Sequence, residues 1–199
     1  MSGIQVIWGP KQVTVPAGDS HFLYGMGYNP NNDRLYVANA YSRRIPYYTS
    51  DTMPTLQGNI PAPDTMTTDL KYCAYDNTFW VAANPAVRRV FKISTAGTVL
   101  RQFANPANDY PTGLAWLPSS RLIYLADRRT ATTSPPEYVY RSDTLGTGTQ
   151  MTIPWTGNAG VRGLAIEPYG PDTTLLMIYT FFNAGATNLD SVGIIEVRR

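Results

Sequence analysis

The sequence is poor in the residues on which most enzyme sites depend. Among its 199 residues there are one cysteine (Cys73), one histidine (His21) and three glutamates (Glu137, Glu167 and Glu196). A tetrahedral zinc site of Cys and His ligands cannot be assembled from so few residues. The three glutamates are scattered over predicted third strands and a turn, which gives no paired acid and base of the kind a glycosidase needs.

Charge is also scarce. Charged residues make up 15% of the chain and the formal net charge is +2, whereas globular domains average about 25% charged residues. The cations are 13 arginines and only three lysines, and arginine suits fixed, bidentate contacts. This composition excludes a general nucleic-acid binder and a disordered chain, and it favours interfaces.

The sequence lacks a long hydrophobic run. Its longest apolar stretch, from Leu175 to Phe182, is interrupted by Thr180 and is far shorter than the roughly 20 residues that span a bilayer. The N-terminus lacks a basic segment followed by an apolar one, so no secretory signal is readable. With a single cysteine as well, we expect a protein made in the cytoplasm, without a membrane segment.

Nucleotide-binding and nucleophile motifs are missing too. No glycine-rich phosphate-binding motif occurs. Asp19, Ser20 and His21 have the residue types of a catalytic triad, but triad members come from separate elements, and no Gly-x-Ser-x-Gly motif is present. We interpret this segment as a loop before the first repeat and Cys73 as a small buried apolar residue. No cofactor is predicted.

What the sequence does contain is one pattern repeated four times. The copies are centred on Met26, Leu70, Leu114 and Leu164, at steps of 44, 44 and 50 residues. Such a period is typical of propellers and helical repeats. The segments are rich in aromatic and β-branched residues and are separated by turn formers such as Asn29 to Asp33, so we predict β-hairpins.

Two further strands follow each hairpin, except in the last copy. The predicted third strands are Arg44 to Tyr48, Arg89 to Ile93, Glu137 to Arg141 and Gly193 to Val197. The predicted fourth strands are Leu56 to Ile60, Val99 to Phe103 and Gln150 to Ile153. Four strands per repeat make a propeller blade. The sequence thus predicts one all-β domain over 1–199, a four-bladed propeller with antiparallel blades at about 20–63, 64–106, 107–157 and 158–199.

The N-terminus supplies a candidate for the missing strand. Residues 12–16 resemble the ends of the other fourth strands, so we predict that they complete the last blade and close the ring, which removes an open edge. Residues 4–8 either add an outer strand or pair with a neighbouring subunit. The alternative to a single four-bladed ring is that several chains associate into a larger one.

The repeats resemble the β-propeller repeats of the NHL, YncE and SMP-30 type. In those families a Gly-hydrophobic-Ala-hydrophobic strand, as in Gly113 to Trp116, precedes a Leu-Tyr-Val-Ala-Asn strand, as in Leu35 to Asn39. The resemblance extends from about Gly25 onward and implies the fold. Those families usually close with six or seven blades, whereas this chain has four repeats.

The resemblance also implies where a channel site would lie. In SMP-30-like enzymes, carboxylates and amides at inner-strand ends gather around a divalent metal in the central channel. The nearest matching positions here are Asn39, Asn84 and Asp127. One carboxylate among amides is a poor set for a hard cation, so we interpret these residues as Asx side chains that close strand turns and predict no metal.

Arginine pairs follow the second strand in three of the four repeats. The six residues are Arg43, Arg44, Arg88, Arg89, Arg128 and Arg129. In a propeller they lie on one face, where they form either a docking surface for an acidic partner or a phosphate-bearing polymer, or ordinary solvated loop charge. Alternation along the third strand would turn one member of each pair inward.

Aromatic residues are abundant, with 14 Tyr, four Trp and six Phe. Most fall on strands, where they fill the space between blades. Tyr110 and Trp155 lie at predicted loops or outer strands, where they either stack on sugars or pack against a partner.

We therefore interpret the chain as a non-enzymatic propeller that acts as a rigid binding or assembly module, with a protein or other copies of itself as partner. Its composition suits a phage virion component of the head decoration or tail. Two alternatives are an SMP-30-like metal-dependent hydrolase or lactonase and a carbohydrate-binding, lectin-like propeller, because propellers carry many functions.

Overall fold

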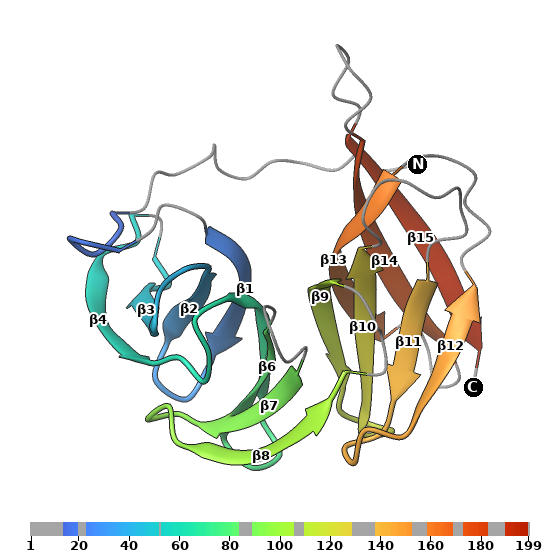
Figure 1. The fold of residues 1–199 in the computed structure, drawn as a ribbon, viewed down its shortest axis with the longest axis horizontal. Coiled ribbons are helices and arrows are strands. Elements are labelled where there is room, and N and C mark those ends of the chain that lie inside the picture. Colours follow the sequence, from blue (N-terminus) through green and yellow to red (C-terminus); the bar gives the residue numbers. More distant parts are fainter. Residues whose placement is uncertain are drawn as a thin grey trace.

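The structure is a computed structural model that describes residues 14–19, 23–51, 53–83, 89–105, 110–128, 138–152, 159–168, 173–182 and 190–198. These ranges contain fifteen strands and no helix (Figure 1). The prediction of an all-β chain is confirmed.

The strands form antiparallel sheets in chain order, one for each sequence repeat. The first sheet contains β1 (Leu23–Asn29), β2 (Arg34–Asn39), β3 (Arg44–Thr49) and β4 (Leu56–Pro61). The second contains β5 (Thr67–Cys73), β6 (Thr78–Ala83), β7 (Arg89–Ser94) and β8 (Val99–Ala104). The third contains β9 (Tyr110–Leu117), β10 (Leu122–Arg128), β11 (Tyr138–Ser142) and β12 (Gly148–Thr152), and the fourth β13 (Ala159–Pro168), β14 (Thr173–Phe182) and β15 (Asp190–Arg198). We call these sheets the first to fourth blades.

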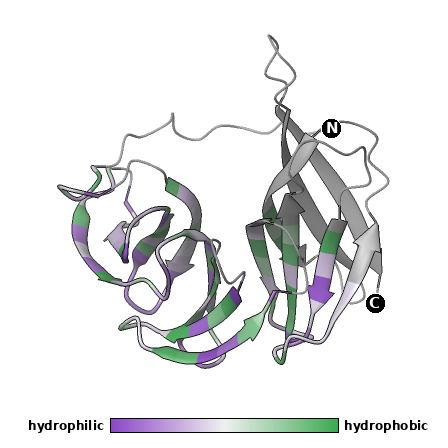
Figure 2. Ribbon diagram, in the orientation of Figure 1, coloured by the Kyte–Doolittle hydropathy of each residue, from purple (hydrophilic) through white to green (hydrophobic). Residues whose placement is uncertain are grey.

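Neighbouring blades pack face to face through apolar clusters. Tyr36 of the first blade meets Phe79 of the second, with ring centroids 4.6 Å apart. Trp80 of the second blade belongs to a cluster with Leu125 of the third, and Leu164 joins the fourth blade to the third. Figure 2 shows hydrophobic stretches on the strands of the first three blades. Alternating side chains explain this packing, because each strand buries one set of residues against each neighbouring blade.

The inner strands carry an irregularity at the same repeat position. The register shifts next to Gly25, Asp69, Gly113 and Gly163, which is the signature of a β-bulge. Neighbouring inner strands also approach closely here. A Cβ atom on Gly25 would lie 2.8 Å from the Asp69 Cα atom, and one on Gly113 would lie 2.9 Å from the Gly163 Cα atom. Glycine at positions 25 and 113 therefore allows the neighbouring inner strands to approach this closely.

The predicted ring-closing strand at 12–16 is not confirmed. Within the described ranges the fourth blade has three strands, and residues 14–16 are not in a strand. Instead, the Thr14 carbonyl accepts a hydrogen bond from the Tyr48 hydroxyl of the first blade at 2.9 Å. A turn closed by the Asp19 N–H and the Pro16 carbonyl at 3.0 Å redirects the chain. Residues 4–8, 12 and 13 lie outside the described ranges.

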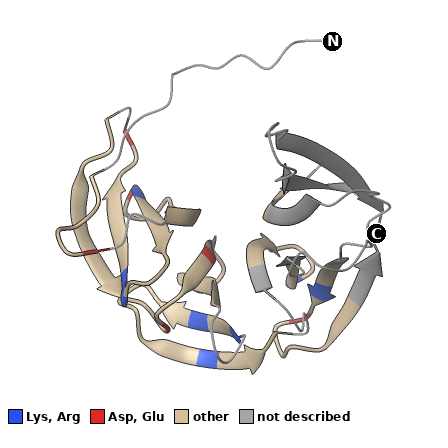
Figure 3. Cartoon of the chain, turned by 45° about the horizontal axis from the view of Figure 1, so that its top comes forward, with Lys and Arg blue, Asp and Glu red and all other residues tan. Residues whose placement is uncertain are grey.

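The blades follow one another around an arc, and the sheets do not close into a ring (Figure 3). The contacts place the inner strands in the order β1, β5, β9 and β13, so β1 lies at one end of the arc. Figure 3 also shows how few charged residues the described strands carry.

Candidate functional site

Each blade has two ends that matter for function. At one end of each blade the first strand turns into the second, and we call this the hairpin end. The second strand ends at the opposite end of the blade, which we call the arginine end. The strand registers place Arg44, Arg89 and Arg128 at the arginine end of their own sheets. Because the inner strands pack in register, the equivalent ends of the blades lie on the same side of the molecule.

The predicted arginine face is only partly described. Arg43 and Arg44 are exposed and Arg89 is partly buried. Arg88, Arg129 and the side chain of Arg128 lie outside the described residues. A surface that collects these cations therefore stays a prediction.

The predicted channel residues behave differently from expectation where they are described. Asn39 ends β2 and is completely buried. Neither polar atom of its amide has a hydrogen-bond partner, so this side chain closes no turn. Within the sheet Asn39 pairs with Leu23 of β1. Asn84 and the side chain of Asp127 lie outside the described residues.

The other sequence candidates have simple outcomes. Cys73 is buried, as predicted. The side chain of Tyr110 and all of Trp155 lie outside the described residues. Among the residues that the structure describes, no three His, Cys, Asp or Glu side chains are grouped closely enough to hold a metal ion.

Within the described part of the chain, no helix has the length and apolar character needed to cross a bilayer.

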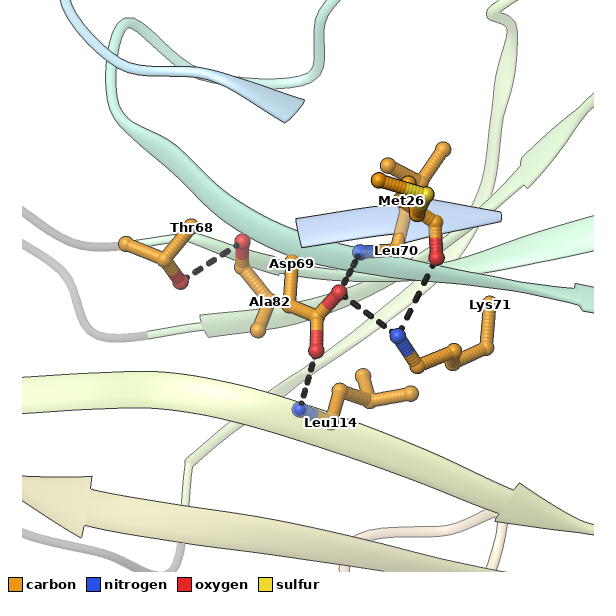
Figure 4. Close-up of polar contacts among 7 residues, drawn as sticks. All are labelled: Met26, Thr68, Asp69, Leu70, Lys71, Ala82 and Leu114. Atoms are coloured by element: carbon orange, nitrogen blue, oxygen red, sulfur yellow. Dashed lines mark hydrogen bonds and ion pairs between the residues drawn. The ribbon is translucent and has the colours of Figure 1, made fainter. Parts of the chain in front are cut away.

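Near the inner strands lies a polar cluster that sequence reasoning missed. Asp69 occupies the bulge position that is glycine in the other three repeats, and it is almost fully buried. Its carboxylate accepts hydrogen bonds from the N–H groups of Leu70, at 2.8 Å, and of Leu114 in the third blade, at 2.7 Å (Figure 4). A single side chain thus ties the second blade to the third.

Lys71 extends this cluster to the first blade. Its ammonium group lies 2.9 Å from the Asp69 carboxylate and donates a hydrogen bond to the Met26 carbonyl at 3.1 Å (Figure 4). Burial raises the pKa of Asp69, although the charge of Lys71 and the hydrogen bonds oppose the rise. The cluster therefore joins three blades with one carboxylate and one ammonium.

A signal for this cluster was present in the sequence. An alignment of the repeats places Asp69 against Gly25, Gly113 and Gly163. The other three repeats have glycine at this position, where neighbouring inner strands lie close together. A carboxylate there indicates a side chain that contacts the inner strand of a neighbouring blade. Glycine at position 25 leaves the space that the Asp69 carboxylate fills, because a Cβ atom there would lie 1.8 Å from the Asp69 Oδ1 atom.

The hairpin end carries a cavity of about 420 Å³ at the junction of the second and third blades. Trp80 and Trp116 line it from the two blades, with ring centroids 6.0 Å apart and planes inclined by 39°. The volume falls within the range of small-ligand pockets, roughly 300–1,000 Å³. This cavity lies at the opposite end of the blades from the predicted arginine face.

Three cations and one carboxylate line the cavity among its described residues: Lys92, Arg101, Arg121 and Asp76. Lys92 pairs with Asp76 and lies 5.1 Å from the centre of the Trp80 ring. Burial raises the pKa of Asp76, but hydrogen bonds from Lys92, Thr78 and Cys73 together hold it below its usual value. The cavity lining thus contains no second carboxylate to pair with the positive charges of Arg101 and Arg121 among its described residues.

Both indole N–H groups at this cavity are unsatisfied. The Nε1 atoms of Trp80 and Trp116 are buried, and neither has a hydrogen-bond partner. A buried donor without a partner costs roughly 1–3 kcal/mol, and unsatisfied groups of this kind are rare in folded proteins. Two residues of the cavity lining therefore carry enclosed indole donors without a partner, and the cavity lining also has surplus positive charge.

A second surface stands out on the first blade. Met26 is 57% exposed, whereas the equivalent residues Leu70 and Leu114 are completely buried and Leu164 is 4% exposed. Those leucines pack against the preceding blade, and the first blade has no preceding blade in the arc. We call Tyr24, Met26 and Tyr28, which are all exposed on β1, the open face.

Comparison with known proteins supports the fold alone. No protein-family model matches the chain, and no curated protein matches it. Among solved structures, the chain is similar to Kuenenia stuttgartiensis hydrazine synthase, a protein that contains a β-propeller, with a TM-score of 0.60 and 18% sequence identity. The match covers 88% of this chain and 51% of that one, so this chain spans about half its length. The similarity is one of fold, and this chain is a β-sheet repeat protein of the propeller type.

Proposed function

We propose that this chain is a non-enzymatic propeller module that assembles with other copies of itself through the open face of its first blade. The observation that carries the proposal is the exposure of Met26, at a repeat position that is buried in the other three blades. An apolar residue at a position built for blade packing is typical of a surface that meets a partner.

A second copy of the chain fits this surface best. In each junction within the chain, the leucine at this position packs on the face of the preceding blade. The blade that would precede β1 is a fourth blade, which lies at the other end of the arc. Head-to-tail contact between copies brings these two surfaces together, and such heterologous contacts close into rings when the geometry allows.

The same contact accounts for the open arc. Four blades that do not close on themselves leave the packing face of the first blade exposed, and copies of the chain supply blades of the same design. Ring closure by the chain's own fourth blade is the competing arrangement. The phage virion setting and carbohydrate binding stay predictions from composition, and the SMP-30-like hydrolase is not favoured by any described contact.

The proposal is tested by measuring mass in solution. Light scattering coupled to size-exclusion chromatography, over a hundredfold range of concentration, should give a mass above 22.0 kDa for the unaltered chain. Met26→Glu places a charge on the open face and should reduce the mass to that of a monomer, because burial of an unpaired charge opposes association.

The matched control is Met53→Glu. Met53 is 70% exposed in the turn before β4 and away from the open face, so the same change there should leave assembly intact. A monomer at every concentration for the unaltered chain would reject assembly through copies. If Met26 of that monomer were also protected from oxidation by peroxide while Met53 reacted, the chain's own fourth blade would cover the open face. Closure of the ring within one chain would then replace the proposal.

A further inference from the structure

The fourth blade carries a feature that its own chain does not explain, a glycine at the β-bulge of its inner strand β13. We propose that this glycine, Gly163, marks a contact surface for the first blade of another copy, with Gly163 lying against Gly25 of that copy. The inference rests on the proposed assembly through the open face, and it names the surface on the partner copy that the open face meets.

The first support is the fit of the bulges at two junctions within the chain. A Cβ atom on Gly25 would lie 2.8 Å from the Asp69 Cα atom, and one on Gly113 would lie 2.9 Å from the Gly163 Cα atom. In both cases the absent side chain points at the inner strand of the following blade. Glycine in a strand commonly marks such a close approach of another backbone, so each of these two glycines is explained by the blade that follows it.

Gly163 holds the equivalent position in the fourth blade. It pairs with Tyr179 directly after the register shift of β13, just as Gly113 pairs with Ala126 next to the register shift of β9. Among the described strands no blade follows the fourth. A glycine inside a strand weakens that strand, and a close neighbour is the usual reason for its presence. The first blade of another copy supplies this neighbour.

The second support is the residue that follows each bulge. A Cβ atom on Gly113 would lie 3.0 Å from the N atom of Leu164. At the preceding junction, the Asp69 carboxylate accepts a hydrogen bond from the N–H group of Leu114 at 2.7 Å. The bulge residue thus faces the backbone nitrogen of one particular leucine in the following blade, whether the bulge residue is glycine or aspartate. Met26 has this leucine's position in the first blade.

Met26 therefore links the two surfaces. Its side chain is 57% exposed because no blade precedes the first one in the arc, and Gly163 is the bulge residue of the blade at the other end. A junction of the kind found within the chain would bring these two residues together from different copies. The contact is head to tail, since each copy uses the open face at one end of the arc and the β13 bulge at the other.

Two glycine changes test the β13 bulge. Gly163→Ala adds a methyl group on the side away from the third blade, so it should weaken self-association of the folded chain about ten- to hundredfold, the range for overpacking a close contact. Gly113→Ala is the matched change, because its methyl group would meet the fourth blade of the same chain. It should lower the melting temperature by roughly 3–10 °C, whereas Gly163→Ala should change it by less than about 2 °C. Light scattering over a range of concentrations and calorimetry of dilute samples measure the two effects.

A mixture of two variants tests whether the surfaces belong to one contact. Met26→Glu blocks the open face and leaves the β13 bulge intact, whereas Gly163→Ala blocks the bulge and leaves the open face intact. At a concentration where each variant alone is a monomer, equal amounts of the two should form a species of twice the monomer mass and nothing larger, because each variant retains one of the two surfaces that the contact needs.

The outcomes separate this inference from the proposed function. If Met26→Glu prevents assembly of the chain, but Gly163→Ala assembles normally or the mixture stays monomeric, the open face meets some other surface and only this inference is overturned. A fall in melting temperature for Gly163→Ala as large as that for Gly113→Ala would also overturn it, because the methyl group would then meet the same chain. A monomer at every concentration for the unaltered chain would reject the assembly proposal and this inference with it.

Discussion

The junction between the first and second blades and the junction between the second and third use the same repeat but bury different side chains. At the first junction Tyr36 packs on Phe79 and Tyr47 within one apolar cluster. At the second, the equivalent of Tyr36 is Trp80, which meets Trp116 beside a cavity. The comparison teaches that strand pairing fixes where blades meet, while the size and polarity of a few side chains decide whether the junction is filled.

The largest expected effect breaks the filled junction. Phe79→Ala removes a completely buried ring and should lower the free energy of unfolding by about 3–5 kcal/mol, the range for such deletions in cores. Chemical denaturation measures the loss. Ile123→Ala, at the equivalent position of the second junction and also completely buried, should cost less because a smaller side chain is removed. A larger loss for Ile123→Ala would contradict the comparison.

An intermediate effect is expected at the polar cluster that spans both junctions. Asp69→Asn keeps the size of the side chain but replaces one acceptor oxygen by a donor, which then faces either the Leu114 N–H or the Lys71 ammonium. We expect a loss of about 2–4 kcal/mol in the free energy of unfolding, the range for a broken buried charged pair. Asp51→Asn is the control, because Asp51 is exposed and accepts a local hydrogen bond from the Met53 N–H at 3.0 Å.

The smallest effect is the pH dependence of two aspartates near the second junction. Burial raises the pKa of Asp69. Hydrogen bonds from the N–H groups of Thr147 and Leu145 lower the pKa of the partly buried Asp143 below its usual 3.8. Asp143 therefore stabilises the fold above that value and loses its contribution as the pH falls through its lowered pKa. Asp69 has the opposite sign: its titration lowers the free energy of unfolding as the pH rises from 3.8 through its raised pKa.

Carboxyl carbon NMR titration of the folded chain checks both directions. The Asp69 signal should titrate above 3.8 and the Asp143 signal below it. In thermal melts, Asp143→Asn should be less stable than the unaltered chain at pH 7, and the difference should shrink at pH 3. Titration of both residues at the same pH would show that burial and the Lys71 charge cancel at Asp69.

The repeat in the sequence predicted the strands well. The predicted third and fourth strands of the first two blades begin at the residues where β3, β4, β7 and β8 begin. Turn formers and alternating apolar residues act over a few neighbouring positions, so they can be read without knowledge of the tertiary structure. The burial of Cys73 was predictable for the same reason, since it lies on a strand between two apolar faces.

The sites were harder to predict. The arginine pairs stand out in the sequence, yet the cavity lies at the other end of the blades and is built from Trp80, Arg101 and Trp116, which occupy three different strands. Their common feature is proximity across a blade junction, which no spacing along the chain shows. The ring-closing strand is not confirmed, and the physical reason is similar: its resemblance to other strands is local, whereas residues 14–19 make a turn and a contact with Tyr48.

The sequence by itself determined that this chain is built of repeated antiparallel β-sheets, because hydrogen-bonded hairpins need only alternation and turn residues. The tertiary structure decided how the repeats meet. Met26 remains exposed at the position where the other blades bury a leucine, and Asp69 lies at a β-bulge where it contacts two neighbouring blades. The junction of the second and third blades keeps a cavity. These outcomes depend on side chains brought together from different blades, and their energies arise only when the blades pack.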